Sequence, residues 1–319
     1  MRIEELIGNT PLVEYRGLGL KQGVRILGKL EGQNPGGSVK DRAAFGMIKG
    51  AMDRGDIKKG DKLVEATSGN TGIALAMIAS IMGVKMTLIM PDNSTRERVL
   101  SMEAYGAKVI LTPAKQTIEY SRTLADEMAA NEGYHLLNHC GNTDNYGQHY
   151  RSTGPEIWKQ TEGKITHFVS GVGTGGTISG VGKYLKEQNP NIKLWGIDTY
   201  GSVFKKYHET GIFDENEIYP YVTEGIGEDI LPKNVNFDVI DGFTKVTDKD
   251  AAIYTQKLAK EEGMFLGNSA GAAIKGLLQL KEHFSKDDVV VVLFHDHGSR
   301  YVGKMFNDDW MKEKGFIES

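Results

Sequence analysis

The chain repeatedly places a short apolar segment before a glycine-rich turn and a longer helical segment after it. The three clearest turns are residues 67–72, 171–177 and 267–271. Parallel strands need helical crossovers of this kind, and both faces of such a sheet are buried. The order therefore predicts an α/β fold with parallel-type sheets covered by helices. The 40 glycines suit tight junctions and close approach of the backbone to a ligand.

The composition limits the possible classes of function. A chain of 319 residues is long enough for two lobes. Its net charge of -4 and pI near 6.1 argue against a nucleic-acid surface, and no uncharged stretch is long enough to span a membrane. The charged start of the chain lacks the apolar run of a signal peptide. Cys140 is the single cysteine, which excludes an internal disulfide and fits reducing, cytoplasmic surroundings.

Two polar stretches lack a clear period. They are residues 138–151 and residues 200–236, and we expect loops that carry function in both. A strand is predicted over residues 237–240, ahead of a helix over residues 248–262.

Residues 34–42 read Asn-Pro-Gly-Gly-Ser-Val-Lys-Asp-Arg. Proline and two glycines make a rigid turn, and Ser38 can cap a helix over about residues 41–54. Lys40 then lies at a helix N-terminus, where the helix dipole and Arg42 both disfavour its ammonium form. A neutral lysine in this position can act as a nucleophile toward a carbonyl.

The glycine-rich turns offer anion sites at helix N-termini, next to the carboxyl ends of strands where α/β sheets bind ligands. Residues 171–177 combine backbone N–H groups with the hydroxyls of Thr174 and Thr177, which suits a dianionic phosphate. Residues 67–72 suit a small carboxylate, and residues 267–271 add the neutral hydroxyl of Ser269. Together with the lysine turn, these features indicate pyridoxal phosphate (PLP).

One motif also fits a second class of enzyme. Gly171, Gly173 and Gly176 have the spacing of the dinucleotide fingerprint, and Asp198 ends the next predicted strand. A nicotinamide-dependent dehydrogenase is therefore an alternative, although it leaves the lysine turn without a role.

Taken together, the motifs resemble the cysteine synthase and cystathionine β-synthase family of PLP enzymes. The matching stretches are residues 7–12, 34–42, 67–72, 173–177 and 269–271, and the similarity runs from about residue 3 to residue 310. Residues 224–232, 298–301 and 309–311 lean toward the catalytic core of cystathionine β-synthase, without its haem segment or regulatory domain.

The resemblance implies a two-lobed PLP-dependent fold type II, like that of tryptophan synthase β, with the active site between the lobes. Residues 1–145 would form the smaller N-terminal lobe, although strands around residues 13–33 would cross to the other lobe. Residues 146–319 would form the larger lobe that binds the cofactor phosphate. A homodimer acting on small amino acids is also implied.

The resemblance assigns roles to individual residues as well. Lys40 would bind PLP as an imine and remove the α-proton of the substrate, Asn70 would contact the ring hydroxyl, and Ser269 would face the pyridine nitrogen. The implied cofactor-binding set is Lys40, Asn70, Gly173, Thr174, Gly175, Gly176, Thr177, Ser269 and Asp296. The implied substrate-binding set is Thr67, Ser68, Gly69, Thr71, His139 and Gly225. A neutral partner of the ring nitrogen favours β-replacement or β-elimination through an aminoacrylate, with L-serine, O-acetyl-L-serine or L-cysteine as substrate.

Some positions depart from the family pattern. His139, followed by Cys140, stands where the family has a glutamine that contacts the substrate carboxylate. His295 and His297 stand in place of the usual Pro-Asp-Ser pattern, and without a third ligand they predict no metal site.

Glu228 and Asp229 form an acidic pair in the loop expected to face the β-carbon of the substrate. An acid there could activate water or a thiol, so both residues are candidate catalytic groups. An L-cysteine desulfhydrase that produces hydrogen sulfide, with serine or lanthionine as the second product, is therefore an alternative to a synthase. A catalytically silent relative with a binding or regulatory role is a third hypothesis.

Overall fold

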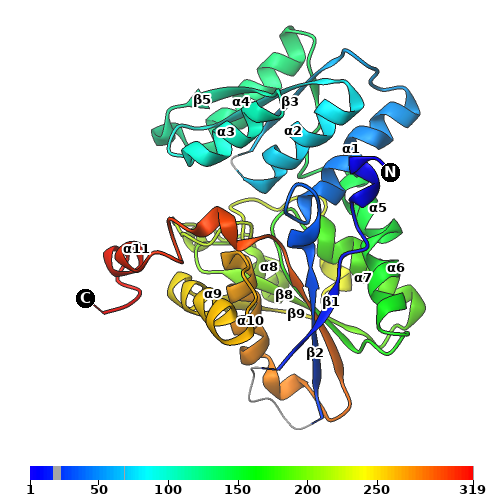
Figure 1. The fold of residues 1–319 in the computed structure, drawn as a ribbon, viewed down its shortest axis with the longest axis vertical. Helices are drawn as coiled ribbons and strands as arrows, with labels where there is room; N and C mark the ends of the chain where they lie inside the picture. Colours follow the sequence, from blue (N-terminus) through cyan, green and yellow to red (C-terminus); the bar gives the residue numbers. More distant parts are fainter. Residues whose placement is uncertain (17–22, 68, 319) are drawn as a thin grey trace.

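Figure 1 shows the chain as a computed structural model, which describes residues 1–16, 23–67 and 69–318. The strands found there are β1 (Leu12–Tyr15), β2 (Arg25–Leu30), β3 (Lys62–Ala66), β4 (Lys85–Pro91), β5 (Lys108–Thr112), β6 (His135–Leu136), β7 (His167–Gly171), β8 (Lys193–Thr199), β9 (Gly242–Val246) and β10 (Val289–Phe294). The α-helices are α1 (Lys40–Arg54), α2 (Asn70–Met82), α3 (Arg96–Ala104), α4 (Thr117–Asn131), α5 (Thr143–Arg151), α6 (Thr153–Gln160), α7 (Gly176–Gln188), α8 (Phe204–Thr210), α9 (Asp248–Glu262), α10 (Asn268–Gln279) and α11 (Asp308–Glu313).

These strands form two sheets, as the alternation of strands and helices predicts. One sheet has the order β5-β4-β3-β6, and its strand pairs are parallel. The other has the order β1-β2-β10-β7-β8-β9, in which β1 and β2 pair antiparallel and the other pairs are parallel. Within the second sheet β2 lies beside β10, with Arg25 opposite Val289 and Leu30 opposite Phe294. The second sheet therefore joins an early strand to a very late one.

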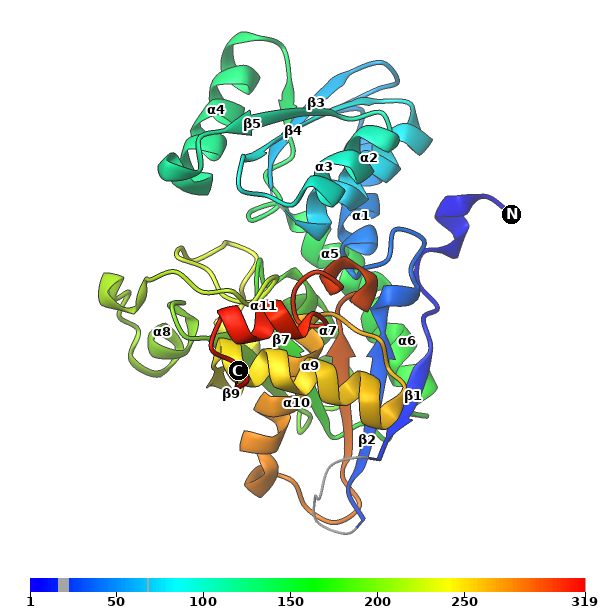
Figure 2. The same ribbon diagram turned by 60° about the vertical axis from the view of Figure 1, so that its left-hand side comes forward.

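The six-stranded sheet is buried on both faces, which explains the unbroken apolar sequence of β10. Val290, Val292 and Phe294 pack into one core cluster together with residues of α9 and α10. Val291 and Leu293 point to the opposite face and pack with residues of α6 and α7. Figure 2 shows these two helical layers on either side of the strands. A strand of β-branched residues with two apolar faces is thus held at the centre of the lobe.

The four-stranded sheet is covered in the same way. Leu63 and Leu88 pack in a cluster with α1 and α2, whereas Val64 and Ile89 pack with α4 on the other face. Figure 1 shows this layered unit above the six-stranded sheet, with α1 and α5 where the two units meet. The division of the chain at residues 1–145 and 146–319 stays a prediction.

Two expected elements are wrong. Residues 143–151 form helix α5 rather than loop, beginning where the Asn142 side chain accepts the N–H of Asp144. The sequence pattern did not reveal this helix, because α5 packs against glycines of neighbouring helices. A Cβ added at Gly46 or Gly180 would lie within 2.8 Å of α5 atoms. Residues 237–239 form a 3-10 turn rather than a strand.

The strand expected at residues 237–240 begins later, at Gly242. The Asn236 side chain accepts the N–H of Asp238 and bends the chain there. In the part of the chain that the structure describes, no helix is both long enough and apolar enough to cross a bilayer.

Candidate active site

Lys40 is the first residue of α1, as the sequence predicts, and it lies at the junction of the two sheet units. The N-cap is Val39 rather than Ser38, but the Ser38 hydroxyl accepts the N–H of Lys40 at 3.2 Å. Burial lowers the pKa of the lysine, opposed by the charges of Cys140 and Glu228. Among the described residues its Nζ has no hydrogen-bond partner. The amine is therefore poised to react rather than to hold a salt bridge.

The turn before Lys40 is held by a buried set of charges. Arg42 bonds Glu31 at 2.7 Å and Glu156 at 2.8 Å, and Lys29 bonds the other oxygen of Glu156 at 2.8 Å. The side chains of Arg42, Glu31 and Lys29 are not exposed at all. Because Glu156 belongs to α6, this cluster ties the lysine turn to the larger sheet unit.

A catalytic pocket of about 250 Å³ opens in front of Lys40. Its walls come from β3 and α2, from α3 and α4, and from the irregular stretch that ends near residue 230. The predicted site residues that line it are Lys40, Thr67, Gly69, Asn70, Thr71, His139, Gly173, Thr174, Gly225 and Glu228. Residues from five separate stretches of the sequence thus meet in one cavity.

The glycine-rich turn after β7 forms a smaller cavity beside Lys40. Gly173, Thr174, Gly175 and Thr177 line it together with Lys40. Gly175 has a φ of +84°, and a Cβ there would lie 2.4 Å from Val235 Cγ2. The backbone therefore closes around the space as only glycine allows, with the N-terminus of α7 pointing at it, which fits a phosphate group.

Two side chains that the sequence reading missed support this phosphate cradle. Asn145 of α5 donates to Thr174 Oγ1 at 3.3 Å, and His149 Nε2 lies 3.3 Å from Thr177 Oγ1. Burial lowers the pKa of His149 to about 3, so the ring is neutral and its hydrogen bonds fix the threonine. No sequence signal marks these two, because they lie on the helix that was predicted as a loop.

His295 lines the same small cavity. Its Nε2 lies 3.3 Å from the carbonyl oxygen of Gly171, its buried Nδ1 has no partner among the described residues, and burial lowers its pKa to about 4. His297 instead pairs with Ser299 at 2.9 Å. Among the residues that the structure describes, no group of three or more metal-ligating side chains is found.

Asn70 connects the pocket to the C-terminal part of the chain. Its Nδ2 donates to Asp296 at 2.8 Å, and its Oδ1 accepts a hydrogen bond from Arg300, which also bonds the carbonyl oxygen of Gly36. Tyr301 donates to the same Asp296 oxygen at 2.6 Å. Asp296 therefore lies behind Asn70 and orients it, rather than lining either cavity.

His139 is held by an acid that the sequence reading did not single out. Glu65 of β3 places Oε1 3.0 Å from His139 Nδ1, and its Oε2 accepts the backbone N–H of His139 at 3.1 Å. Burial alone would lower the pKa of His139, but the Glu65 carboxylate and Cys140 raise it to about 10. A cationic ring therefore faces the pocket in the place of a neutral glutamine.

Glu228 faces the pocket, whereas Asp229 is not among its lining residues. Burial raises the pKa of Glu228, opposed by Arg122, whose Nη2 lies 3.6 Å from the carboxylate. Asp229 lies 3.9 Å from Arg122 on the outer side. Glu228 thus has the burial and position of a general base or acid.

Some predicted residues lie away from the two cavities. Ser269 is the second residue of α10 and is 2% exposed, and Gly176 packs against Asn145, but neither lines the catalytic pocket or the smaller cavity. Ser68 lies outside the described residues. Asp198 is fully buried and accepts the N–H groups of Thr199 and Lys205, so it does not face the turn at residues 171–177 as a dinucleotide site requires.

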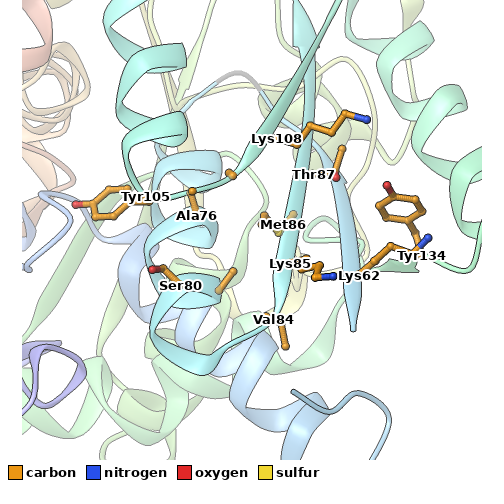
Figure 3. Close-up of a pocket in the computed structure, with 13 residues that line it drawn as sticks. Lys62, Ala76, Ser80, Val84, Lys85, Met86, Thr87, Tyr105, Lys108 and Tyr134 are labelled. Atoms are coloured by element: carbon orange, nitrogen blue, oxygen red, sulfur yellow. The ribbon is translucent and has the colours of Figure 1, made fainter. Parts of the chain in front are cut away.

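A larger cavity, of about 440 Å³, lies elsewhere (Figure 3). Lys62, Lys85 and Lys108, the first residues of β3, β4 and β5, line it together with Tyr105 and Tyr134. Ligands of α/β sheets bind at the carboxyl ends of the strands, whereas this cavity lies at their amino ends. The smaller pocket at Lys40 is therefore the candidate active site.

Comparison with known proteins identifies the family of the chain. The family described as pyridoxal-phosphate dependent enzyme matches residues 3–296. Cysteine synthase B of Pseudomonas aeruginosa is 45% identical over 300 residues, covering 94% of this chain and 95% of that protein. Cystathionine beta-synthase of Apis mellifera is 37% identical over 321 residues, covering 98% of this chain and 62% of that protein. The crystal structure of a hydrogen sulfide-producing enzyme from Fusobacterium nucleatum matches with a TM-score of 0.86 at 37% identity, covering 94% of this chain and 99% of that one.

Proposed function

Because the chain belongs to the family of pyridoxal-phosphate dependent enzymes of fold type II, with cysteine synthases and cystathionine β-synthases among its relatives, we propose that it performs β-replacement and β-elimination on small amino acids. The first substrate is L-cysteine, L-serine or O-acetyl-L-serine. The observation that carries the proposal is the position of Lys40, which lines both cavities. This lysine of lowered pKa lies between the small cavity that suits a phosphate and the polar catalytic pocket. The dehydrogenase alternative is wrong, since the family is different and Asp198 is already bonded to the backbone.

The residues present fit the cofactor. Gly175 lines the small cavity and packs against Val235 where a Cβ would not fit, and buried His295, whose Nδ1 has no partner among the described residues, lines the same cavity. Lys40 would bind the aldehyde carbon, residues 173–177 the phosphate, and Asn70 the ring hydroxyl, with Ser269 toward the ring nitrogen. Bound PLP supplies an electron sink for the bonds at the α-carbon of an amino acid.

The chain's own groups would divide the remaining work. Thr67, Thr71 and Gly69, with Ser68, would bind the substrate carboxylate at the N-terminus of α2, and Gly225 would close the opposite side. The cation of His139 adds a charge that a glutamine would not. Lys40 Nζ would take the proton from the α-carbon, because its lowered pKa makes the neutral amine available.

Glu228 is the group that favours sulfide release over simple synthesis. L-cysteine and water give L-serine and hydrogen sulfide; with a second L-cysteine in place of water the products are lanthionine and hydrogen sulfide. Either nucleophile must lose a proton as it bonds to the β-carbon, and Glu228 would accept it. Burial raises the pKa of this carboxyl, which makes its carboxylate a stronger base. Asp229 would act from outside the pocket, on Arg122.

We also propose a cytoplasmic homodimer that binds neither nucleic acid nor membranes. The net charge of -4 and the single cysteine support this setting. Leu100 and Leu111 are about half exposed on the unit of the four-stranded sheet, which supports an apolar surface for a second copy. Light scattering of the purified protein would give twice the chain mass of 35.1 kDa.

The test is to mix the PLP-loaded protein with each of the three amino acids in turn and to measure sulfide, product and the visible absorption band. We expect L-cysteine to give sulfide with lanthionine or serine. Borohydride should attach the cofactor to the peptide that contains Lys40, and Lys40→Ala should abolish both results. A protein that stays colourless after exposure to PLP would contradict the proposal, and one that binds PLP but converts none of the three would support the silent relative.

A further inference from the structure

A second cavity adjoins the catalytic pocket between α4 and the segment that carries Cys140. It has a volume of about 260 Å³, and we call it the side cavity. Ala66, Arg122 and His139 line both cavities. The two spaces therefore lie back to back, with these three residues as the shared wall.

The side cavity leads inward from the surface. Asp126 and Asn138 line it and are exposed, whereas Ala66 and Ala125 line it and are buried. Its inner end is thus the back of the catalytic pocket, and its outer end meets solvent. A small molecule in the side cavity would be separated from the catalytic pocket only by the side chains of Ala66, Arg122 and His139.

The charges around the side cavity balance. Arg122 and His139 are cationic, and Glu65 and Asp126 are anionic. Glu65 is engaged by His139 at 3.0 Å, and Arg122 lies 3.6 Å from Glu228 in the catalytic pocket. This arrangement has no spare cation to hold a carboxylate, so an amino acid is a poor occupant.

Apart from these four charged residues and Asn138, the lining of the side cavity is apolar or soft. Ala125 of α4 and Leu136 of β6 face Ile230 across the cavity, and the thiol of Cys140 lies 3.6 Å from His139 Nε2. These apolar and thiol walls suit a small, polarisable, neutral sulfur species better than a carboxylate.

We propose that the side cavity binds hydrogen sulfide as the neutral molecule and passes it between solvent and the β-carbon of the bound amino acid. The inference rests on the proposed function, in which sulfide is a product or a nucleophile. No bond forms in the side cavity itself, because the carbon–sulfur bond is made or broken in the catalytic pocket. The amino acid and sulfide then use separate routes.

The test uses a substitution that narrows the side cavity at a residue that does not line the catalytic pocket. Ala125→Leu adds bulk to its wall, and Ala129→Leu, one turn later on α4 and packed against the same apolar cluster, is the matched control. Cysteine formation is measured with O-acetyl-L-serine and sodium sulfide. We expect Ala125→Leu to raise the KM for sulfide about tenfold or more, with kcat/KM for O-acetyl-L-serine within about twofold of the parent and the control unchanged.

A larger thiol substrate distinguishes a variant whose side cavity is blocked from a variant whose catalytic pocket is distorted. L-Homocysteine carries a carboxylate, for which the side cavity has no spare cation, so it should enter with the amino acid and its KM should not change in Ala125→Leu. Ile230→Phe narrows the opposite wall from an irregular loop and should reproduce the effect if Ala125→Leu does not fold.

The outcomes are distinct. Equal increases in KM for sulfide and homocysteine, or an unchanged KM for sulfide in both folded variants, would overturn the side route while leaving the proposed function intact. A parent protein that forms neither cysteine nor sulfide would refute the proposed function, and the side route with it.

Discussion

Arg42 and Glu31 form a bidentate ion pair beneath the candidate catalytic lysine, with Nε 2.7 Å from Oε2 and Nη2 2.9 Å from Oε1. Neither side chain is exposed. Glu31 also accepts the Thr10 hydroxyl at 2.7 Å, so the pair joins the start of the chain to the first residues of α1. The position of Lys40 therefore depends on charges that never contact the substrate.

Arg42→Met should destabilise the protein strongly, because it leaves the buried carboxylate of Glu31 without its ion-pair partner. Removing one partner of a buried pair costs about 3–5 kcal/mol, which a fall in melting temperature would reveal. Arg54→Met is the control, since Arg54 pairs with Asp56 and Asp144 at the surface and its loss should change the melting temperature little. Equal effects of the two substitutions would show that the buried cluster does not hold the lysine turn.

Gly175→Ala should weaken cofactor binding more than it weakens the fold. Gly175 and Gly211 both have positive φ, +84° and +70°, but a Cβ at Gly175 would lie 2.4 Å from Val235, whereas at Gly211 nothing lies within 4 Å. Gly211→Ala should cost about 1 kcal/mol of backbone strain and leave PLP binding intact. Gly175→Ala should raise the Kd for PLP about tenfold or more, measured by equilibrium dialysis. Unchanged binding would place the phosphate elsewhere.

The His139–Glu65 pair should make stability depend on alkaline pH. The pKa of His139 is raised from 6.5 to about 10 in the folded chain, so the folded state keeps a proton that the unfolded state loses. Its contribution is full below about pH 6.5 and declines as the pH rises toward about 10. The fall in melting temperature over that interval should be smaller in His139→Gln than in the parent, and the same fall in both would contradict a charged His139.

Glu228→Gln should slow sulfide release from L-cysteine about a hundredfold, because the attacking water or thiol loses its base. Asp229→Asn should cost less than about tenfold, since Asp229 does not line the catalytic pocket. Exchange of the α-proton with deuterated solvent depends on Lys40 and should stay near the parent rate in both variants. Parent-like sulfide release by both would remove the acidic pair from the mechanism.

Regular elements with strong apolar patterns could be predicted from the sequence. β10 and the turns after β3 and β7 have unambiguous signals, since buried parallel strands are apolar throughout and anion sites need glycine. Helix α5 could not, because it is polar and is buried by contacts with Gly46 and Gly180 rather than by an apolar face. Local periodicity carries no information on such packing.

The same limit applies to the site. Lys40, Asn70 and the turn at residues 173–177 carry their own motifs, and the structure brings them together. Glu65 and Arg300 act on His139 and Asn70 from 74 and 230 positions away, a separation over which no spacing rule holds. Supporting residues of this kind become visible only when the chain is folded.

The pairing of β2 with β10 has a consequence for biosynthesis. All strands of the four-stranded sheet lie between residues 62 and 136. This unit can therefore fold before translation of the chain is complete. β2 emerges before that unit but must wait for a neighbour made some 250 residues later. Until then its hydrogen-bonding edge is unprotected, so a nascent chain stalled late in translation is the species that chaperones would be expected to hold.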